Sequence, residues 1–244
     1  MDNSQTEAQK ILRDGAKALG MSLTDAQIAC FSAYTRILTE YNEKVNLTAI
    51  TRPDEIALKH YVDSLCIMRY VEIPQGAAVA DVGSGAGFPG VPLKIARPDI
   101  KLTCIDGLNK RVVFLNALRD ELGLADNFKS LHMRGEEAGR EQGLRGQFDI
   151  VTARAVARLD TLAEYCLPLV KKCGKFCAMK GPNAAGEADE AKHAVGMLGG
   201  RIEKCESYVL PGTDMGRTMI IIKKISDTTS KYPRPTAQIK KHSL

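Results

Sequence analysis

A glycine-rich turn between an apolar strand and a helix constrains this chain more than any other segment. The strand is expected at residues 77–82, and glycines follow at 83, 85, 87 and 90, with a helix expected to begin near Pro89. Glycines at the end of a strand permit positive φ and let a ligand approach the backbone closely. The segment therefore predicts a ligand-binding crevice, against the alternative of a turn that binds nothing.

The remaining pattern predicts a layered α/β fold. Short apolar runs that we expect to be strands lie at 77–82, 101–106, 128–132, 148–152 and 176–180, with helical stretches at 89–96, 109–122, 159–170 and 184–198. Two further runs, 201–210 and 217–225, predict a hairpin joined by 211–216. Alternating strands and helices favour a parallel sheet. We predict the class I Rossmann-like S-adenosylmethionine-dependent methyltransferase fold, a mainly parallel seven-stranded sheet with a C-terminal antiparallel hairpin, because a plain dinucleotide fold more often ends on another parallel strand.

Three regions are expected along the chain. Residues 1–73 form an N-terminal helical region packed on the catalytic domain, in which Thr24 caps one helix and Pro53 opens another. Residues 74–226 form the domain that binds S-adenosylmethionine. Residues 227–244 contain two prolines and few apolar side chains, which predicts a basic extended tail.

The charge of the chain is concentrated at its C-terminal end. The formal net charge is +5, and the last 22 residues contain six Lys or Arg and one Asp, so residues 1–222 are formally neutral. A basic tail on a neutral body indicates an anionic macromolecular partner, with a merely solvated tail as the alternative. We expect the tail to bind this anionic partner, which is RNA if the resemblance described below holds, and its deletion to leave cofactor affinity unchanged.

The composition also indicates a compartment. Seven cysteines, an odd number without a CxxC pair, favour a reduced, cytoplasmic protein without a zinc site. The polar N-terminus has no secretory pattern, and no apolar run is long enough to span a membrane. We therefore expect no membrane partner and no metal.

The glycine turn discriminates between two kinds of cofactor. Residues 85–90 match the G-x-G-x-x-G pattern of dinucleotide sites, which keeps an NAD-dependent oxidoreductase as an alternative. Asp81 would repel a pyrophosphate, and Pro89 removes one N–H donor that would bind it. S-adenosylmethionine carries no phosphate and has a cationic sulfonium, so a nearby carboxylate favours it.

Further candidate residues follow the other strands. Asp106 ends the second strand, where a carboxylate accepts hydrogen bonds from ribose hydroxyls, although a helix cap or a solvated turn residue is the alternative. Gly135 and Glu136 are placed to meet an adenine, unless they belong to a charged surface loop. Arg154 ends the fourth strand and could contact the cofactor carboxylate or a substrate phosphate, with a structural salt bridge as the alternative. Lys180 ends the fifth strand and could face the substrate.

Six segments carry a more specific pattern: YNEKVNLT at 41–48, KHYVDS at 59–64, DVGSGAGFPG at 81–90, LNKR at 108–111, DIVTARAV at 149–156 and KYPR at 231–234. With these motifs the chain resembles the bacterial RsmG (GidB) family of ribosomal RNA small-subunit methyltransferases, over about residues 20–235. The predicted cofactor site comprises Gly83, Ser84, Gly85, Gly87, Phe88, Asp106, Gly107, Leu108, Gly135, Glu136 and Arg154. Phe88 is expected to be a wall of the channel for the methionine part.

The resemblance implies methyl transfer from S-adenosylmethionine to N7 of one guanine in 16S ribosomal RNA. Guanine N7 has a free lone pair at neutral pH, so the site needs positioning and no general base. Asn46, Lys59, Arg154 and Lys180 are the candidates on the substrate side, whereas His60 is expected to be a core or RNA-facing histidine. The implied partner is 16S ribosomal RNA or the small ribosomal subunit, bound by a monomer. A non-catalytic RNA-binding or assembly protein on the same scaffold and a small-molecule methyltransferase remain alternatives.

Overall fold

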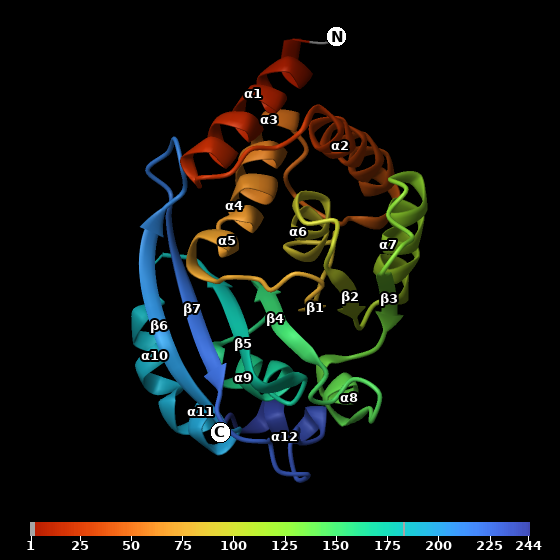
Figure 1. Ribbon diagram of the computed structural model, residues 1–244. Helices are drawn as coiled ribbons and strands as arrows, with labels where there is room; N and C mark the ends of the chain where they lie inside the picture. Colours follow the sequence, from red (N-terminus) through yellow and green to blue (C-terminus); the bar gives the residue numbers. More distant parts are fainter. Residues whose placement is uncertain (1–2, 183) are drawn as a thin grey trace.

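The computed structural model describes residues 3–182 and 184–244. The first two residues of the predicted region 1–73, and residue 183 of the predicted region 74–226, lie outside this range. Within it, one sheet has the strand order β3-β2-β1-β4-β5-β7-β6 (Figure 1). The strands are β1 (Ala78–Val82), β2 (Lys101–Asp106), β3 (Phe128–His132), β4 (Phe148–Arg154), β5 (Val170–Lys180), β6 (Gly200–Val209) and β7 (Gly216–Lys224).

The strand directions confirm the predicted fold. Neighbouring strands from β3 to β5 are parallel, whereas β7 runs antiparallel to both β5 and β6. The expected bounds of β2 and β3 are correct. β5 begins earlier than predicted because its register against β4 is irregular near Phe148 and Ile150, and Cys173 takes a left-handed φ of 71° there. The predicted helix 159–170 consequently ends at Cys166.

Helices cover both faces of the sheet (Figure 1). Those before the first strand are α1 (Asn3–Ala18), α2 (Asp25–Val45), α3 (Pro53–Ile56), the π-helical η1 (Ala57–Val62), α4 (Asp63–Leu65) and α5 (Ile67–Tyr70). Those after it are α6 (Gly90–Ala96), α7 (Asn109–Glu121), α8 (Gly135–Arg140), α9 (Leu159–Cys166), α10 (Ala185–Glu190), α11 (Lys192–Met197) and α12 (Thr236–Lys241). The predicted helix 184–198 is thus two short helices.

The N-terminal helices share their hydrophobic core with the sheet. One buried cluster joins Phe31 and Leu38 of α2 to Leu93 of α6 and Leu102 of β2. The second cluster lies under the opposite face and contains side chains of β4, β5, α9 and α11. The described part of the helical region, residues 3–73, therefore has no core separate from that of the sheet, and burial of its apolar face stabilises both.

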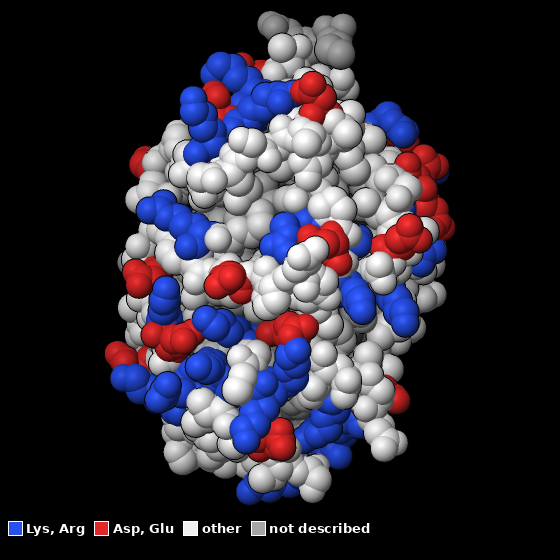
Figure 2. Space-filling view, viewed as in Figure 1, with Lys and Arg blue, Asp and Glu red and all other residues white. Residues whose placement is uncertain are grey.

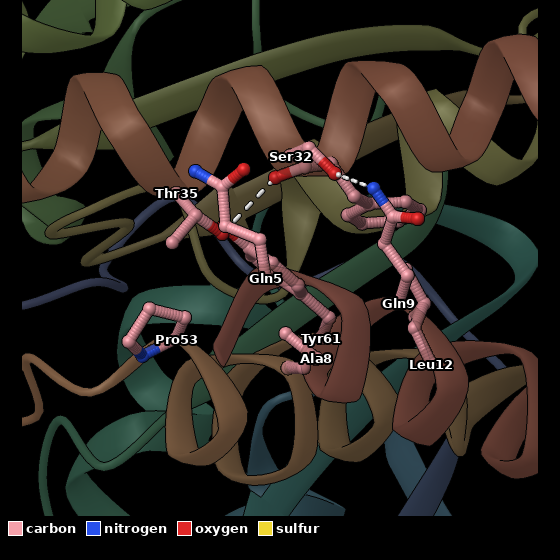
Figure 3. A pocket seen from close by; sticks show the side chains of 10 residues that line it. Gln5, Ala8, Gln9, Leu12, Ser32, Thr35, Pro53 and Tyr61 are labelled. Atoms are coloured by element: carbon pink, nitrogen blue, oxygen red, sulfur yellow. Dashed lines mark hydrogen bonds between the residues drawn. The ribbon is translucent and has the colours of Figure 1, made fainter. Parts of the chain in front are cut away.

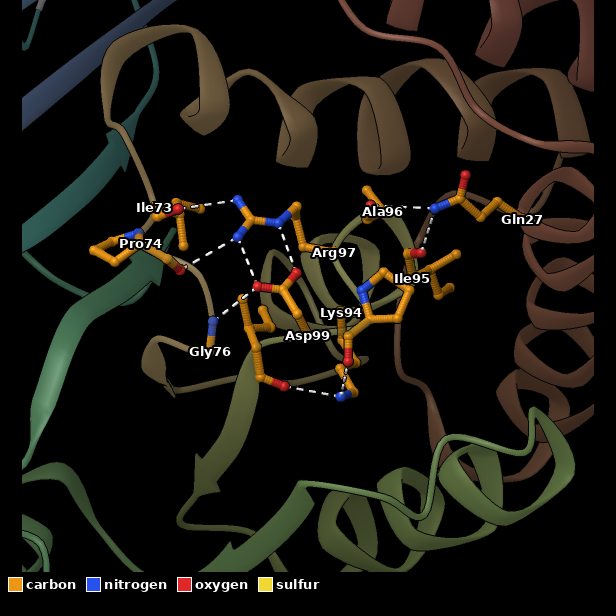
Figure 4. Close-up of polar contacts among 11 residues, drawn as sticks. Gln27, Ile73, Pro74, Gly76, Lys94, Ile95, Ala96, Arg97 and Asp99 are labelled. Carbon is orange, nitrogen blue, oxygen red and sulfur yellow. Dashed lines mark hydrogen bonds and ion pairs between the residues drawn. The ribbon is translucent and has the colours of Figure 1, made fainter.

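Polar contacts fix α2 on the helix that follows the glycine turn (Figure 4). Thr24 and Gln27 form the capping box that begins α2, and the Gln27 amide also donates to the carbonyls of Ile95 and Ala96 at the end of α6. Nearby, Arg97 pairs with Asp99 through bonds of 2.7 Å, which holds the pKa of that carboxyl well below its usual range. These contacts hold α2 and the chain before β1 against the C-terminal end of α6.

A small hollow between α1, α2 and η1 belongs to the packing of these helices. Gln9 donates to Ser32 Oγ at 3.1 Å, and the hydroxyls of Thr35 and Tyr61 lie 2.9 Å apart. Figure 3 shows these polar side chains, together with Gln5, around the gap between the helices. No residue of the glycine turn lines this hollow.

The prediction that residues 227–244 form an extended tail is wrong. They contain α12, and Tyr232 and Ile239 are buried against the rest of the protein. The backbone N–H and the guanidinium of Arg234 bond to the carboxylate of Glu164 at 2.7–3.2 Å, and the Glu164 side chain is buried. A buried carboxylate requires a partner, so the charge of Arg234 holds the segment against α9.

The basic excess is correspondingly smaller at the surface than the sequence indicates. Lys224 is buried, donates to the carbonyls of Leu167 and Leu198, and has its pKa lowered to about 7 by burial. Arg234 is paired with Glu164. Two of the six Lys and Arg residues in the last 22 positions are therefore bonded within the fold. Figure 2 shows Lys and Arg side chains gathered over the half of this face that holds β6 and α12, interleaved with acidic side chains. No helix among the described residues is long and apolar enough to cross a membrane.

Candidate functional site

Two hollows lie at the carboxyl ends of the parallel strands, where ligands bind in open α/β sheets. Each has a volume of about 700 Å³, which includes the solvent-filled space at its opening. The first hollow is lined by Val82, Gly83, Ile105, Asp106, Gly107, Leu108, Arg111, Met133, Arg134, Gly135, Glu136, Val156, Tyr165, Thr236 and Lys240. The second hollow is lined by Lys59, His60, Asp63, Arg154, Ala155, Met179, Lys180, Gly181 and Arg217.

Six backbone N–H groups of the glycine turn are engaged within the protein. Their acceptors are the carbonyls of Ile105 and Ser84 and the carboxylates of Asp81 and Asp106. The engaged donors are Gly83, Ser84, Gly85, Gly87, Phe88 and Gly90. A turn whose donors are used in this way offers no cradle for a pyrophosphate, unlike the dinucleotide sites that the glycine spacing resembles.

Asp81 does not act as the sequence suggests. Its side chain is fully buried, accepts from the Gly90 N–H at 3.0 Å and from Thr152 Oγ1 at 3.3 Å, and burial raises its pKa to about 6. The expectation that its charge faces the ligand is therefore wrong. Asp81 instead holds the start of α6 against β1 and β4.

Asp106 joins the glycine turn to the loop after β2. One carboxylate oxygen accepts from the Gly85 N–H at 2.8 Å and the other from the Leu108 N–H at 2.9 Å, and the guanidinium of Arg111 lies 3.4 Å away. The side chain borders the first hollow. Each oxygen of a carboxylate has further acceptor capacity, so Asp106 can also accept from ligand hydroxyls.

Apolar side chains form walls of the first hollow. Leu108 and Val156 are large hydrophobic residues that are nevertheless 46% and 40% exposed. Gly83, at φ 72°, permits the approach of one wall, because a Cβ there would lie 2.7 Å from Val156 Cγ2. Apolar walls beside two carboxylates, Asp106 and Glu136, with no free phosphate cradle, fit an adenosine group that lacks phosphate, as in S-adenosylmethionine.

Ten of the eleven predicted cofactor residues separate into three groups, and Phe88 is described below. Six of them line the first hollow: Gly83, Asp106, Gly107, Leu108, Gly135 and Glu136. Ser84, Gly85 and Gly87 build the turn beneath it, and the buried Ser84 hydroxyl bonds to the backbone of Asp81 and Ile105. Arg154 lines the second hollow instead.

Phe88 packs beneath the second hollow and is not among the residues that line either hollow. Its ring is nearly fully buried and stacks on His60 at 4.4 Å and on Tyr34 at 5.5 Å between ring centroids. The guanidinium of Arg154 lies 5.0 Å from the same ring. Phe88 thus supports the side chains of the second hollow, and contact with the methionine part remains a prediction.

Sequence reasoning missed residues that come from distant parts of the chain. Val156 lies in the DIVTARAV motif and could have been found there, because it follows Arg154 at the end of β4. Tyr165, Thr236 and Lys240 reach the first hollow from α9 and α12, and Asp63 and Arg217 reach the second from α4 and β7. Asp63 lies in the KHYVDS motif and could also have been found there, whereas the patterns around Tyr165, Thr236, Lys240 and Arg217 carry no local signal of a site.

An ionic network centred on Arg154 forms a wall of the second hollow. Its guanidinium donates to Asp63 Oδ2 at 2.8 Å and to the Lys59 carbonyl at 3.3 Å. Arg217, from β7, donates to the other oxygen of Asp63 at 3.0 Å. The network ties the end of β4 to η1, and π-helical turns of this kind are frequent at functional sites.

His60 is held as a neutral imidazole. Its Nδ1 lies 3.2 Å from a nitrogen of Arg154, which can only donate, so Nδ1 accepts and the ring proton lies on Nε2, 2.9 Å from Thr48 Oγ1. Burial, followed by the charge of Arg154, lowers the pKa of His60 to about 3. Both ring nitrogens are engaged, so His60 is not poised to remove a proton from a substrate.

Replacing His60 with Gln should remove part of the acid sensitivity of the protein. The folded-state pKa of about 3 lies below the unfolded value of 6.5, so the unfolded chain binds an extra proton between these limits. Stability is therefore full above about pH 6.5 and falls as the pH drops toward 3, by at most about 1.4 kcal/mol per pH unit. Urea unfolding at several pH values should show a shallower slope for His60→Gln.

The exposed His193 provides the matched control. His193→Gln should retain the slope of the unmodified protein. The buried Asp81, whose raised pKa acts in the opposite direction between about pH 4 and 6, is present in all three proteins and cancels in the comparison. Equal slopes for the unmodified protein and His60→Gln would contradict the neutral, buried assignment.

Two of the predicted substrate-side residues have structural roles. Asn46 is the left-handed C-cap of α2 and does not line the second hollow. Lys180 lines it, but its ammonium donates to the Ala157 carbonyl at 2.6 Å and pairs with Glu187 at 2.7 Å, which holds the loop after β4. Lys59 lies at the hollow and pairs with Glu55 at 2.6 Å. Among the described residues, no group of three or more His, Cys, Asp or Glu is placed to hold a metal ion.

A sheet of this order, with a carboxylate bound to its glycine turn where dinucleotide folds present free N–H donors, defines a class I S-adenosylmethionine-dependent methyltransferase. Solved structures share the fold. A complex from Haloferax volcanii between a methyltransferase activator and a methyltransferase matches with a TM-score of 0.58 at 13% identity, covering 78% of this chain and 98% of that chain. An S-adenosylmethionine-dependent O-methyltransferase from Thermotoga maritima matches at 0.51 and 16% identity, covering 79% and 72%.

The sequence comparisons identify the family. The family model for rRNA small subunit methyltransferase G matches residues 27–212. Ribosomal RNA small subunit methyltransferase G of Lactobacillus helveticus is 50% identical, covering 87% of this chain and 89% of that protein. The protein of the same name from Acetivibrio thermocellus is 44% identical over the full length of both chains. The chain belongs to this family, and its cofactor is S-adenosylmethionine.

Proposed function

We propose that this enzyme methylates N7 of one guanine in the 16S ribosomal RNA of the small subunit, acting as a monomer in the cytoplasm. The first hollow holds the adenosine part of the cofactor and the second hollow holds the target base. The observation that carries the proposal lies at the end of β4, where Arg154 and the following Ala155 line the second hollow while Val156 lines the first. The two hollows therefore meet at consecutive residues.

The side chains of the second hollow suit a nucleic acid. Four cationic groups surround the hollow, from Lys59, Arg154, Lys180 and Arg217. Their carboxylate partners are Asp63, Glu55 and Glu187, so the cations exceed the carboxylates by one. A basic crevice attracts the phosphates of RNA, and its affinity falls with salt. The buried Met179 adds an apolar contact for a base that has left its stack.

Both ring nitrogens of His60 are hydrogen-bonded within the protein, which agrees with a reaction that needs no general base. Bound S-adenosylmethionine supplies an electrophilic methyl group, and guanine N7 already carries a free lone pair at neutral pH. The residues of the site therefore orient the base and exclude water, and none has to hold a proton from the substrate. The network of Arg154, Asp63 and Arg217 fixes the wall against which the base is oriented.

The direct test is transfer of a labelled methyl group from S-adenosylmethionine to small-subunit RNA, with naked 16S RNA and assembled subunits compared. Borohydride–aniline treatment cleaves RNA at 7-methylguanosine, so a single cleavage site is expected in the labelled product. RNA binding without methyl transfer would favour the non-catalytic alternative. Methylated RNA that resists cleavage would overturn the N7 assignment, and calorimetry with NADH should give no binding.

A further inference from the structure

We infer that the C-terminal helix α12 is part of the cofactor site, with Thr236 as the residue that positions Glu136. The inference rests on the assignment of the first hollow to the cofactor. It also contradicts the expectation from charge that residues 227–244 serve RNA alone. Thr236 and Lys240 of α12 line the first hollow together with Glu136 of α8.

The contact between α12 and α8 is direct. The Thr236 hydroxyl donates to Glu136 Oε1, and the Glu136 side chain is nearly fully buried. A buried carboxylate with a single hydroxyl donor on one oxygen has its rotamer fixed by that donor, and its other oxygen stays available to a ligand. Glu136 would thereby present an acceptor toward the amino group of an adenine.

The segment before α12 is anchored at several points, so the helix has a defined position. Arg234 bonds to the buried Glu164, as described above. The guanidinium of Arg145 donates to the carbonyls of Thr228, Thr229 and Tyr232 at 2.6–3.1 Å. Figure 1 shows α12 at the end of the molecule that holds α8 and α9.

A glycine of α8 provides the space for this docking. A Cβ on Gly139 would lie 2.9 Å from Pro233 Cγ and 3.2 Å from Pro168 Cβ. The close approach brings the chain before α12 against the helix that carries Glu136. The anchors and the close packing are what a wall of a binding site requires, and a solvated tail has no need of them.

The test is calorimetric titration of S-adenosylhomocysteine into the full-length protein and its variants. Thr236→Val keeps the shape of the side chain and removes the donor, and should weaken binding about fivefold. Thr236→Ser restores the hydroxyl and should bind within about twofold of the unmodified protein. Lys241→Ala, a change at an exposed position of the same helix that does not line the hollow, is the matched control and should bind normally.

A positioning role makes a further prediction that a structural role does not. If Thr236 acts through Glu136, Thr236→Val should lose its effect in a Glu136→Ala background, because alanine leaves the hydroxyl without its acceptor and both substitutions then remove the same interaction. The ligand-free Thr236→Val should remain folded, although the loss of a donor to a buried carboxylate lowers its melting temperature. Unchanged affinity of Thr236→Val, or additive losses in the double variant, would overturn the inference. If Asp106→Ala also failed to weaken binding of S-adenosylhomocysteine, the assignment of the first hollow to the cofactor would be wrong.

Discussion

Replacing Asp106 with alanine should weaken binding of S-adenosylhomocysteine by about 100-fold, which corresponds to about 2.7 kcal/mol. The substitution removes the carboxylate assigned to the ribose hydroxyls. It also removes the acceptor of the Gly85 and Leu108 N–H groups, so the glycine turn loses its link to the loop after β2. Hydrogen bonds to a charged group contribute about 1.5–3 kcal/mol each, which makes this one of the two largest effects we expect.

Affinity for RNA separates a local effect from general damage. Binding of small-subunit RNA at a fixed salt concentration should change by less than about twofold in Asp106→Ala, because its basic contacts lie elsewhere. Asp126→Ala, at an exposed position between α7 and β3, is the matched control and should bind the cofactor product normally. Equal losses of cofactor and RNA binding would contradict the role of Asp106 at the ribose.

Replacing Arg154 with methionine should lower the rate of methyl transfer at least about 100-fold and the free energy of unfolding by about 3 kcal/mol. The guanidinium holds Asp63, His60 and the carbonyl of Lys59 together, so its loss frees one side of the second hollow. The stability cost lies at the low end of the range for a broken buried pair, because Arg217 still pairs with Asp63. Single-turnover transfer and urea unfolding measure the two quantities.

The exposed Arg158, four residues further along, is the matched control. It pairs with the exposed Glu190, and surface pairs of this kind contribute about 1 kcal/mol or less, so Arg158→Met should change neither quantity much. Binding of S-adenosylhomocysteine should persist in Arg154→Met, since Arg154 lines the second hollow and not the first. Normal transfer by Arg154→Met would remove the assignment of the second hollow to the substrate.

The ends of β2 and β3 and the turn between β1 and α6 could be predicted because their signals are local. Alternation of apolar residues marks the strands, and glycines mark the turn. Asp106 and Glu136 could be predicted for the same reason, since the carboxyl ends of neighbouring parallel strands meet at one edge of the sheet. Leu108 is implied by the family resemblance alone. Asp81 also ends a strand, but its side chain is buried and does not face the ligand. A position at a strand end therefore does not determine whether the side chain faces the crevice or the core.

The docking of α12 and the pairing of Asp63 with Arg217 could not be predicted, because each depends on residues far apart in the chain. Nothing in residues 227–244 indicates that Glu164 is buried and requires a cation, yet that requirement brings Arg234 and then α12 against the first hollow. Asp63 and Arg217 are 154 positions apart and become neighbours only when β7 pairs with β5. Spacing in a sequence cannot report such pairs.

The sequence by itself determined the fold class, the crevice and the residue types around the adenosine, because strand periodicity and turn chemistry act over a few residues. The tertiary structure decided which of those side chains face a ligand. It placed Asp81 and Phe88 in the packing, left Asp106 and Leu108 at the surface of the first hollow, and turned a presumed tail into one of its walls. Burial and charge pairing are properties of the assembled layers, and they exist only once distant segments have met.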